Sequence, residues 1–418
     1  MTESRRLGLR IALPAIGVAV ALLLAGCSSS GGASSTSAAS KTNFGGVKLT
    51  VWNSIDYNPY EAQQKSFFEK CGKKLGITVD DQTINGDYAS ALLKAAGSKS
   101  LPGIVQLSTD VELPTLAAEG ALANLHSLGV STEGESSSVS SLGTYKGTLY
   151  GLPSNIENYA IFYDKVAFAN AGISTPPATF ADFVADAKKV TSSTEAGVAF
   201  SGQSGDGSVA AYFLPWILSA GGNPADPTNP GTIAAVNLYK KLVANGSLSK
   251  EFVDWGWNST DQWTAGKAVI TVDGPWELVD SSLKVKYATA PFPTLKAGQK
   301  PQVGLLGYAY GVSATLSSKE QQAAAALIQC RSSEANQVAT AIDGGYIPAL
   351  TAAQQAFVAK VPSAKSFVDA VPTAYNPAKL GTKWNTLQNV FAAALQDAAT
   401  NGDSAEQALA KAAQAKGQ

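Results

Sequence analysis

The sequence predicts an α/β fold in which strands and helices alternate along the chain. A β-rich run over Lys48–Trp52 precedes an amphipathic helical pattern over Tyr60–Leu75, and the run Ile77–Asp80 precedes a second helical pattern over Tyr88–Ala96. A third β-rich run follows at Gly103–Leu107. Alternation of this kind is typical of a parallel sheet, whose ligands bind at the carboxyl ends of the strands.

The loops at those strand ends carry the first candidate binding residues. Asn53 and Asp56 follow the first strand, and Asp110 follows the third, just before a short helical segment around Thr115–Glu119. Ligands of parallel sheets sit at such loops. We therefore expect polar contacts to a ligand from this edge of the sheet.

The middle of the chain continues the same pattern. Ala160–Asp164 is expected to form a strand. Thr179 begins a helix, and Asp182 lies at the position that completes a capping box. Two further helices are predicted over Ala211–Ala220, which is apolar, and over Ile233–Asn245. The remaining C-terminal third is alanine-rich and helical.

Tryptophan is concentrated where the last predicted strand of the middle region ends. Four of the seven tryptophans lie between positions 255 and 276, namely Trp255, Trp257, Trp263 and Trp276. Trp276 follows a Gly-Pro pair, which predicts a tight turn that leaves the indole projecting outward. Trp263 is expected in the core, whereas loop packing and a cleft position both fit Trp255 and Trp257.

The composition excludes several classes of protein. Lys and Arg number 31 against 32 Asp and Glu, so there is no basic excess to attract nucleic acid. The one histidine, His126, falls in a predicted loop, where a structural or surface role is expected. The chain has no phosphate-binding loop, dinucleotide glycine motif or Gly-x-Ser-x-Gly elbow. We expect no cofactor, no metal site and no catalytic residue, and charged residues at only 15% suit a neutral polar ligand.

The N-terminus reads as a secretory signal over residues 1–26. Three arginines before position 11 precede an almost wholly apolar run, Ile11–Ala25, which is too short for a stable membrane span. The following Leu24–Cys27 (Leu-Ala-Gly-Cys) resembles the lipobox of bacterial lipoproteins, in which Cys27 is diacylated, for example by palmitate. The alternative is an uncleaved anchor. Both interpretations predict a protein tethered to the extracellular face of the cell membrane.

The segment that follows fits a tether. Residues 27–44 hold the cysteine and a stretch of Ser, Gly, Ala and Thr, a composition that cannot bury a core and behaves as a flexible coil. Two more cysteines, Cys71 and Cys330, lie in helical patterns. Outside the cytosol they can form a disulfide, and the alternative is two buried free thiols.

The order of motifs resembles the extracellular sugar-binding proteins that serve ABC importers, with the maltose and maltodextrin-binding proteins as the nearest comparison. The resemblance covers Val47 to Ala413. The motifs that carry it are Val47–Trp52, Gly103–Leu107, Ala118–Leu125, Tyr145–Pro153, Phe162–Lys165, Gly172–Phe180, Gly266–Trp276 and Gly344–Pro348.

This resemblance implies a two-lobe, periplasmic-binding-protein-like fold of type II with a hinged ligand cleft between the lobes. The first lobe would comprise residues 45–153 with 295–346, and the second residues 154–294 with 347–418. The expected ligand is a mono- or oligosaccharide of maltodextrin type. The expected partners are the permease subunits of an ABC importer, and the protein itself is expected to be a monomer.

The resemblance also assigns site residues. Sugar recognition needs flat aromatic rings for the C–H faces of a pyranose and carboxylates or amides for its hydroxyls. Trp276 and Trp384 match stacking positions, although packing against a neighbouring lobe also fits Trp276. The remaining candidates are Glu157, Asp110, Tyr212, Asp56, Asn53 and Tyr346.

Two departures from the maltose-type pattern flank Asp110. Where the comparison has an aromatic and a basic residue, this chain has Leu107 and Val111. The loss of a platform and of a cationic hydrogen-bond donor should alter which sugar, or which subsite, is favoured.

Three other functions stay open on the sequence. A secreted glycoside hydrolase would need two acids about 5–10 Å apart, and Glu157 with Asp110 would be the pair to test. The same fold could bind a non-sugar ligand such as a polyamine, which needs acids boxed by aromatic rings. A surface adhesin is disfavoured by the tryptophans at strand ends.

Overall fold

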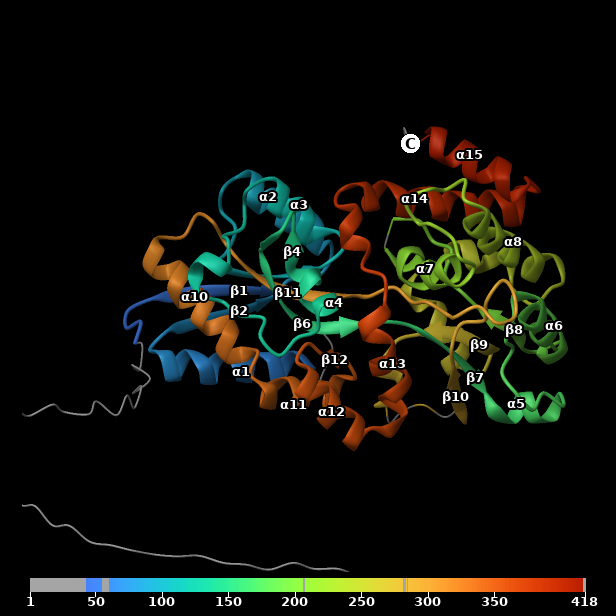
Figure 1. Ribbon diagram of the computed structural model, residues 1–418, viewed down its shortest axis with the longest axis horizontal. Helices are drawn as coiled ribbons and strands as arrows, with labels where there is room; N and C mark the ends of the chain where they lie inside the picture. Colours follow the sequence, from blue (N-terminus) through green and yellow to red (C-terminus); the bar gives the residue numbers. More distant parts are fainter. Residues whose placement is uncertain (1–42, 55–59, 206, 281–282, 284, 416–418) are drawn as a thin grey trace, which may run out of the picture. The chain divides into compact units, whose positions relative to one another are not determined.

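Two β-sheets organise the part of the chain between Thr42 and Gln418 (Figure 1). The computed structural model describes residues 43–54, 60–205, 207–280, 283 and 285–415. Two of the expected functional residues, Cys27 and Asp56, lie outside these described residues.

The larger sheet has six strands in the order β12-β6-β11-β3-β1-β2. Strands β1, β2 and β3 run parallel, as the strand–helix alternation predicts, whereas β11 pairs antiparallel with both β3 and β6, and β12 pairs antiparallel with β6. The bounds of the six strands are β1 Lys48–Asn53, β2 Thr78–Thr83, β3 Ile104–Ser108, β6 Gly151–Glu157, β11 Leu306–Val312 and β12 Ile347–Pro348.

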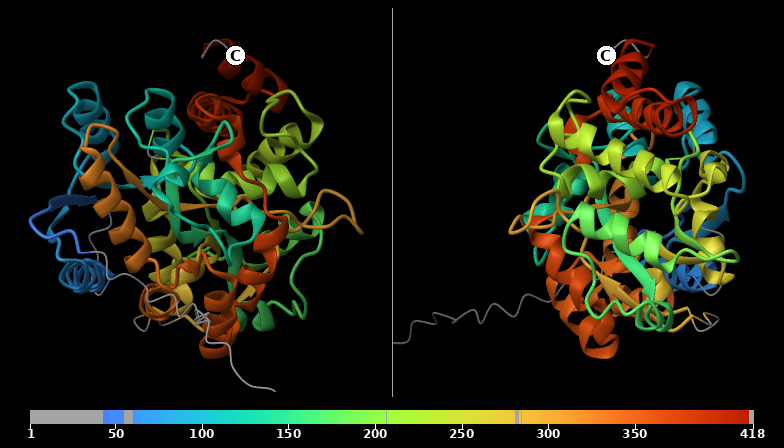
Figure 2. Two further views of the ribbon diagram at one scale, coloured as in Figure 1. Left: turned by 60° about the vertical axis from the view of Figure 1, so that its left-hand side comes forward. Right: turned by 90° about the vertical axis from the view of Figure 1, so that its right-hand side faces the viewer.

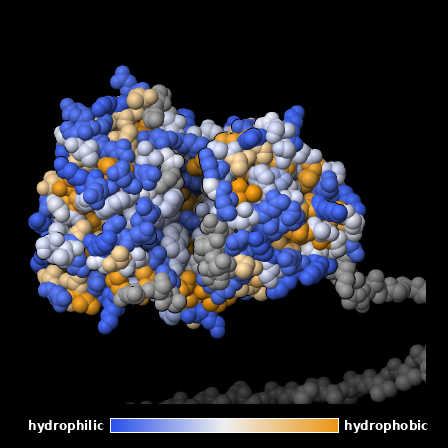
Figure 3. All heavy atoms as spheres, turned by 180° about the vertical axis from the view of Figure 1, so that it is seen from behind, coloured by the Kyte–Doolittle hydropathy of each residue, from blue (hydrophilic) through white to orange (hydrophobic). Residues whose placement is uncertain are grey.

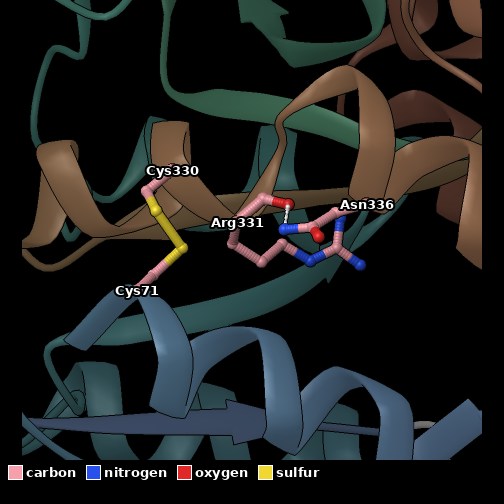
Figure 4. Close-up of a disulfide and its surroundings, with 4 residues drawn as sticks. All are labelled: Cys71, Cys330, Arg331 and Asn336. Carbon is pink, nitrogen blue, oxygen red and sulfur yellow. Dashed lines mark hydrogen bonds between the residues drawn. A yellow bond between two sulfur atoms is a disulfide. The ribbon is translucent and has the colours of Figure 1, made fainter. Parts of the chain in front are cut away.

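Helices from the N-terminal region and from residues 318–360 belong with this sheet. Helix α1 packs against α10 and α11, and the disulfide between Cys71 and Cys330 joins α1 to α10 with a Cα–Cα distance of 5.8 Å (Figures 1 and 4). The bounds are α1 Tyr60–Leu75, α2 Tyr88–Gly97, α3 Glu112–Ala118, α4 Ser137–Ser140, α10 Ser318–Arg331, α11 Glu334–Gly344 and α12 Thr351–Lys360. A small hairpin, β4 Thr144–Tyr145 with β5 Thr148–Leu149, precedes β6.

The smaller sheet has four strands in the order β10-β7-β9-β8. Only β8 and β9 run parallel in it. Its strands are β7 Ala160–Asp164, β8 Ala196–Ala199, β9 Ala268–Asp273 and β10 Tyr287–Ala290. The helices that follow in this region are α5 Lys165–Asn170, α6 Phe180–Val190, α7 Ser208–Ser219, α8 Pro230–Ala244, α9 Asp261–Thr264, α13 Lys365–Ala370, α14 Lys383–Gln396 and α15 Ala405–Ala415.

Local sequence accounts for two of these helices. Thr179 and Asp182 form the expected capping box at the start of α6, which satisfies backbone N–H groups that the first turn leaves unpaired. Every residue of α7 is buried, because the helix is apolar on all sides and is enclosed by its neighbours. Helices α14 and α15 pack against α7 and α8, at the top of both views in Figure 2.

The chain passes between the sheets within two residues. Strand β6 ends at Glu157 in the larger sheet and β7 begins at Ala160 in the smaller one, so only Asn158 and Tyr159 intervene. Strand pairing therefore assigns to the first lobe two short segments that the sequence analysis expected in the second. Residues 154–157 and 347–348, expected in the second lobe, hydrogen-bond in the sheet of the first.

A third boundary also differs from the expectation. Residues 295–303 were expected in the first lobe, but Leu295 and Val303 pack against the hydrophobic core built around α7, α8 and α14. The cause is long-range pairing, since Thr294 bridges to Thr179 in the second lobe before the chain returns to β11. Sequence spacing alone does not specify such pairings.

Candidate functional site

An unbroken line of aromatic rings runs from the larger sheet's region to the smaller one's. Successive ring centroids along it are 5.2 to 5.9 Å apart, within the range of favourable tilted and edge-to-face contacts. In order, its members are Tyr60, Tyr346, Trp276, Tyr159, Tyr212 and Trp257.

Most of these rings lie at the ends of helices or strands or in the segments between them. Tyr60 begins α1 and Tyr346 lies between α11 and β12 in the first lobe. Tyr159 stands at the crossing between β6 and β7. In the second lobe, Trp276 lies in the turn after β9, and Tyr212 lies within α7. The line therefore spans the place where the two lobes meet, and the face in Figure 3 is hollowed between the two halves of the Thr42–Gln418 unit.

Two glycines make room for Trp276. A Cβ atom on Gly274 would lie 2.2 Å from the indole Cη2, so the ring folds back over its own turn only because residue 274 has no side chain. On the first-lobe side, Gly345 has a φ of +74° and a Cβ there would lie 2.3 Å from the Cα of Trp276. The backbones of the two lobes therefore approach each other closely at Trp276 and Gly345.

Two carboxylates lie beside this aromatic line. Glu157 ends β6 and accepts a hydrogen bond from the Tyr159 hydroxyl at 3.1 Å. Asp110 follows β3 and accepts a hydrogen bond from Trp384 Nε1 at 3.0 Å, which links the first lobe to α14. Both acids are 8% exposed.

Burial changes the protonation of these acids. It raises the pKa of Glu157 to about 8, and nearby Asp110 raises it further while the Tyr159 hydrogen bond opposes the shift. Burial also raises the pKa of Asp110, against the hydrogen bond from Trp384. A proton on Glu157 is thus favoured near neutral pH while the lobes are in contact.

The structure brings together five of the expected residues. Trp276, Tyr346 and Tyr212 belong to the aromatic line, Glu157 is hydrogen-bonded to it through Tyr159, and Asp110 interacts electrostatically with Glu157.

Asn53 is placed differently. Its Nδ2 donates to Asp81 Oδ1 at 2.5 Å, and its Oδ1 accepts from the Tyr310 hydroxyl at 3.1 Å. The Asn53 amide is therefore engaged inside the first lobe, away from the aromatic line.

Trp384 also differs from its expected role as an exposed stacking platform. Its indole is 0% exposed and belongs to the hydrophobic core around α7, α8 and α14, with Phe391 at 6.3 Å between ring centroids. The sequence marks an aromatic residue near the start of a helix but not how deeply the neighbouring elements cover it. In this structure Trp384 contributes a hydrogen bond to Asp110 rather than an open ring face.

Sequence reasoning missed three tyrosines of the site. Tyr60 and Tyr159 complete the aromatic line, and Tyr308 contacts Tyr346 with ring centroids 6.5 Å apart. The position of Tyr159, two residues after Glu157 at the lobe crossing, was an available signal. In a regular strand Tyr308 and Tyr310, which are two residues apart, would lie on the same face. The pairing of β11 with β6 shifts register between Tyr308 and Ala309, an irregularity that the sequence does not predict.

A polar groove adjoins one end of the line, with a volume of about 210 Å³. Its polar lining consists of amides, Gln203 before α7 and Asn385, Gln388 and Asn389 on α14, and Val111 joins from the first lobe. Asn385 Oδ1 and Gln388 Nε2 are buried atoms without a hydrogen-bond partner. A Cβ built on Gly207, which also lines the groove, would lie 3.9 Å from both Gln388 Oε1 and Trp257 Cζ2.

The half-exposed Trp257 lies beside Gly207, one of the residues that line this groove. Its side chain is 45% exposed, an unusual exposure for so large an apolar group, and it contacts Tyr212 at the end of the aromatic line. Buried polar groups normally have partners, so unpaired amide atoms in a groove indicate a place where a polar ligand or water binds.

Two features of the described part of the chain bear on other chemistries. Residues 43–54, 60–205, 207–280, 283 and 285–415 include no group of three or more His, Cys, Asp or Glu side chains arranged to hold a metal ion. Over the same residues, no helix combines the length and apolarity needed to cross a bilayer.

Comparison with known proteins places this geometry in a family. Residues 65–369 match the model for bacterial extracellular solute-binding proteins. The maltooligosaccharide ABC transporter solute-binding lipoprotein of Streptococcus pneumoniae (strain ATCC BAA-255 / R6) is 26% identical over 278 residues, which span 60% of this chain and 61% of that relative. The galactooligosaccharide-binding protein of Bacillus subtilis (strain 168) is 26% identical over 96% of this chain and 95% of its own length.

Solved structures agree on the fold. The maltose-bound MalE3 of T. maritima has a TM-score of 0.77 at 19% sequence identity, and the match covers 89% of this chain and 99% of that one. The predicted two-lobe type II fold is confirmed. Because the family model matches most of the chain, the protein belongs to the bacterial extracellular solute-binding proteins.

Proposed function

We propose that this protein is an extracellular receptor that binds a sugar between its two lobes and delivers it to an ABC import permease. The observation that carries the proposal is the aromatic line across the lobes, with Glu157 hydrogen-bonded beside it. Aromatic faces take the C–H surface of a pyranose, and carboxylates take its hydroxyls. The relatives named above, which carry maltooligosaccharide and galactooligosaccharide in their names, support the same ligand class.

Lobe closure is the proposed signal to the permease. The short crossing at Asn158–Tyr159 lets the lobes rotate, and a sugar that contacts both of them favours the closed form by its differential affinity. Trp384 and Asp110 already hydrogen-bond across the lobes. In this scheme that bond stabilises the closed form and leaves ring stacking to Trp276.

The amide groove favours an oligosaccharide over a single sugar. It extends the aromatic line at Trp257, and its unpaired amide atoms on Asn385 and Gln388 can hydrogen-bond further hydroxyl groups. Gln388→Ala should then weaken binding of a tetrasaccharide by at least fivefold and leave a disaccharide of the same linkage unchanged. Equal losses of affinity for the tetrasaccharide and the disaccharide would contradict a role of the groove in binding the additional sugar units.

We further propose that Cys27 carries the lipid that holds the receptor at the membrane, as a monomer. The lipobox-like sequence and the Ser/Gly-rich segment after it support this anchor, and the pneumococcal relative is named a lipoprotein. Cys27→Ala should release the protein from the membrane fraction. Continued membrane association of that variant would contradict the lipid anchor.

The decisive experiment is a thermal-shift titration of the protein with maltodextrins, galacto- and xylo-oligosaccharides, trehalose and polyamines. A ligand at a hundred times its Kd stabilises the native state by about 2.7 kcal/mol, which raises the melting temperature measurably. A shift with one glycan series, followed by recovery of the intact sugar, supports the receptor. Recovery of cleaved sugar would instead favour a glycoside hydrolase, and a shift with polyamines alone would overturn the sugar ligand.

A further inference from the structure

Three carboxyl groups gather where β3 and β6 end on either side of the start of β11. In the strand register, Tyr308 of β11 pairs with Ser108 on one side and with Asn155 on the other. Asp110 and Glu112 follow Ser108, and Glu157 follows Asn155. All three acids act electrostatically on the Tyr308 hydroxyl, which agrees with their convergence around this strand end.

The hydrogen-bond donors to these acids are neutral. Trp384 donates to Asp110, Tyr159 donates to Glu157, and the backbone N–H of Ser108 donates to Glu112 at 2.5 Å. Among the described residues, no lysine or arginine acts electrostatically on Glu112 or Glu157, and the charged group that does act on both is Asp110. The residue after Asp110 is Val111, which carries no charge.

Such a set of acids lacks the compensation that buried charges need. A buried carboxylate without a cation is strongly disfavoured, and it either takes up a proton or is paired with a positive group. Hydroxyl groups of a neutral sugar supply hydrogen bonds but no charge. An ammonium group supplies both, with three donors that can reach several carboxylates at once.

We propose that the ligand carries a basic amine, as an aminated saccharide, and that its ammonium group binds among Asp110, Glu112 and Glu157. This inference rests on the proposed sugar-receptor function and narrows it to one class of sugar. The aromatic line supports the sugar ring, with Trp276 and Tyr159 next to Glu157. The ammonium replaces the proton that Glu157 otherwise holds near neutral pH.

The test compares saccharides that differ in the amine. Isothermal titration calorimetry of the full chain at pH 7 would use glucosamine disaccharide against cellobiose and diacetylchitobiose, which share the β-1,4 linkage. We expect the glucosamine disaccharide to bind tenfold or more tightly than either neutral disaccharide.

Two further readouts locate the effect at the acids. In wild type, amine binding should release protons, so its measured heat should vary between buffers of different ionisation enthalpy, whereas heat from the neutral sugar should not. In Glu157→Gln, the advantage of the amine should fall to less than threefold. An advantage that survives both Glu157→Gln and Asp110→Asn, or amine binding without proton release, would contradict the inference.

The possible outcomes distinguish the inference of an aminated ligand from the proposed sugar-receptor function on which it rests. Neutral saccharides that bind as tightly as the aminated ones would overturn the amine and leave the sugar receptor intact. Binding of spermidine without binding of any saccharide would overturn both. Absence of heat with every saccharide would likewise count against the receptor and the amine together.

Discussion

Two carboxylates, the partly buried Asp81 in β2 and the buried Glu157 at the end of β6, have different surroundings. Asp81 lies inside the first lobe and accepts a hydrogen bond from Asn53. Burial raises its pKa to about 6, and Lys65 and Arg331 both favour its ionised form. The fold thus supplies this acid with an amide partner and with two cations from α1 and α10.

Glu157 lies between the lobes, and its surroundings compensate its charge much less. Its hydrogen-bond donor is the neutral Tyr159 hydroxyl, its charged neighbour is the acid Asp110, and its pKa is raised to about 8. Within this pair, the chain provides cations near the acid inside one lobe, whereas the acid between the lobes is left for a proton or a ligand. Stability and binding should therefore respond to different substitutions.

The largest expected effect concerns the one residue that serves both regions. Trp384→Ala removes a fully buried indole and the donor to Asp110, so the free energy of unfolding should fall by about 3–5 kcal/mol. Urea denaturation measures this change. The matched control, Trp257→Ala, removes a 45% exposed indole and should cost less than about 1 kcal/mol. Equal losses in the two variants would show that Trp384 is not part of the packed core.

The next effect tests the first lobe alone. The disulfide joins α1 to α10 across a sequence separation of 259 residues, next to the buried Arg331, whose backbone carbonyl accepts from Asn336 (Figure 4). Replacing Cys71 and Cys330 together by Ser should lower the free energy of unfolding by about 2–5 kcal/mol. Sugar affinity at low temperature should stay unchanged, because neither cysteine reaches the aromatic line. A matching loss of affinity would break the separation between the two regions.

Trp276→Ala should give the reverse pattern. Loss of the ring next to Glu157 and Tyr159 should weaken sugar binding by about 1–3 kcal/mol, with a small change in unfolding free energy. Calorimetric titration and urea denaturation of the same samples measure both quantities. Trp263→Ala is the matched control, since this fully buried indole belongs to a core cluster and should lower stability without changing affinity. Unchanged affinity in Trp276→Ala would remove the stacking role.

The parts of the fold that sequence reasoning anticipated are those fixed by local patterns. Alternating runs predict β1, α1 and β2, and a capping box predicts the start of α6, because each depends on neighbouring residues. The insertion of β11 between β3 and β6 depends on pairing across about 150 to 200 residues and leaves no local signature. For that reason the lobe boundaries in the structure differ from those expected from the sequence.

The site residues also divide into those that local sequence marks and those that only tertiary contacts position. Trp276 stands out in the sequence because a Gly-Pro turn follows a strand, and the structure places it in the aromatic line. Whether Trp384 is open or covered depends on α7 and on the loop after β3, which come from distant parts of the chain. Tyr60 and Tyr308 enter the site through tertiary contacts with Tyr346.

The last prediction isolates Glu157 through the pH dependence of stability. The folded protein holds a proton on Glu157 up to a pKa of about 8, while the ordinary value of 4.5 applies to the unfolded chain. Because the folded state binds more protons in that window, Glu157 makes stability fall as pH rises from about 4.5 to about 8, by at most about 1.4 kcal/mol per pH unit. Glu112, with a pKa of about 7, and Glu135, with a pKa of about 8, add slopes of the same sign.

The Glu157→Gln variant separates the contribution of Glu157 to this pH dependence from the contributions of Glu112 and Glu135. The variant keeps the shape of the side chain but cannot titrate, so unfolding free energies from urea denaturation at pH 5, 6, 7 and 8 should fall less steeply than in wild type. The groups that face Glu157 are Asp110 and the hydroxyls of Tyr159, Tyr308 and Tyr60, and the tyrosines stay protonated over this range because burial raises their pKa values. Identical slopes would mean that Glu157 is ionised in the folded protein, and the contrast with Asp81 would then disappear.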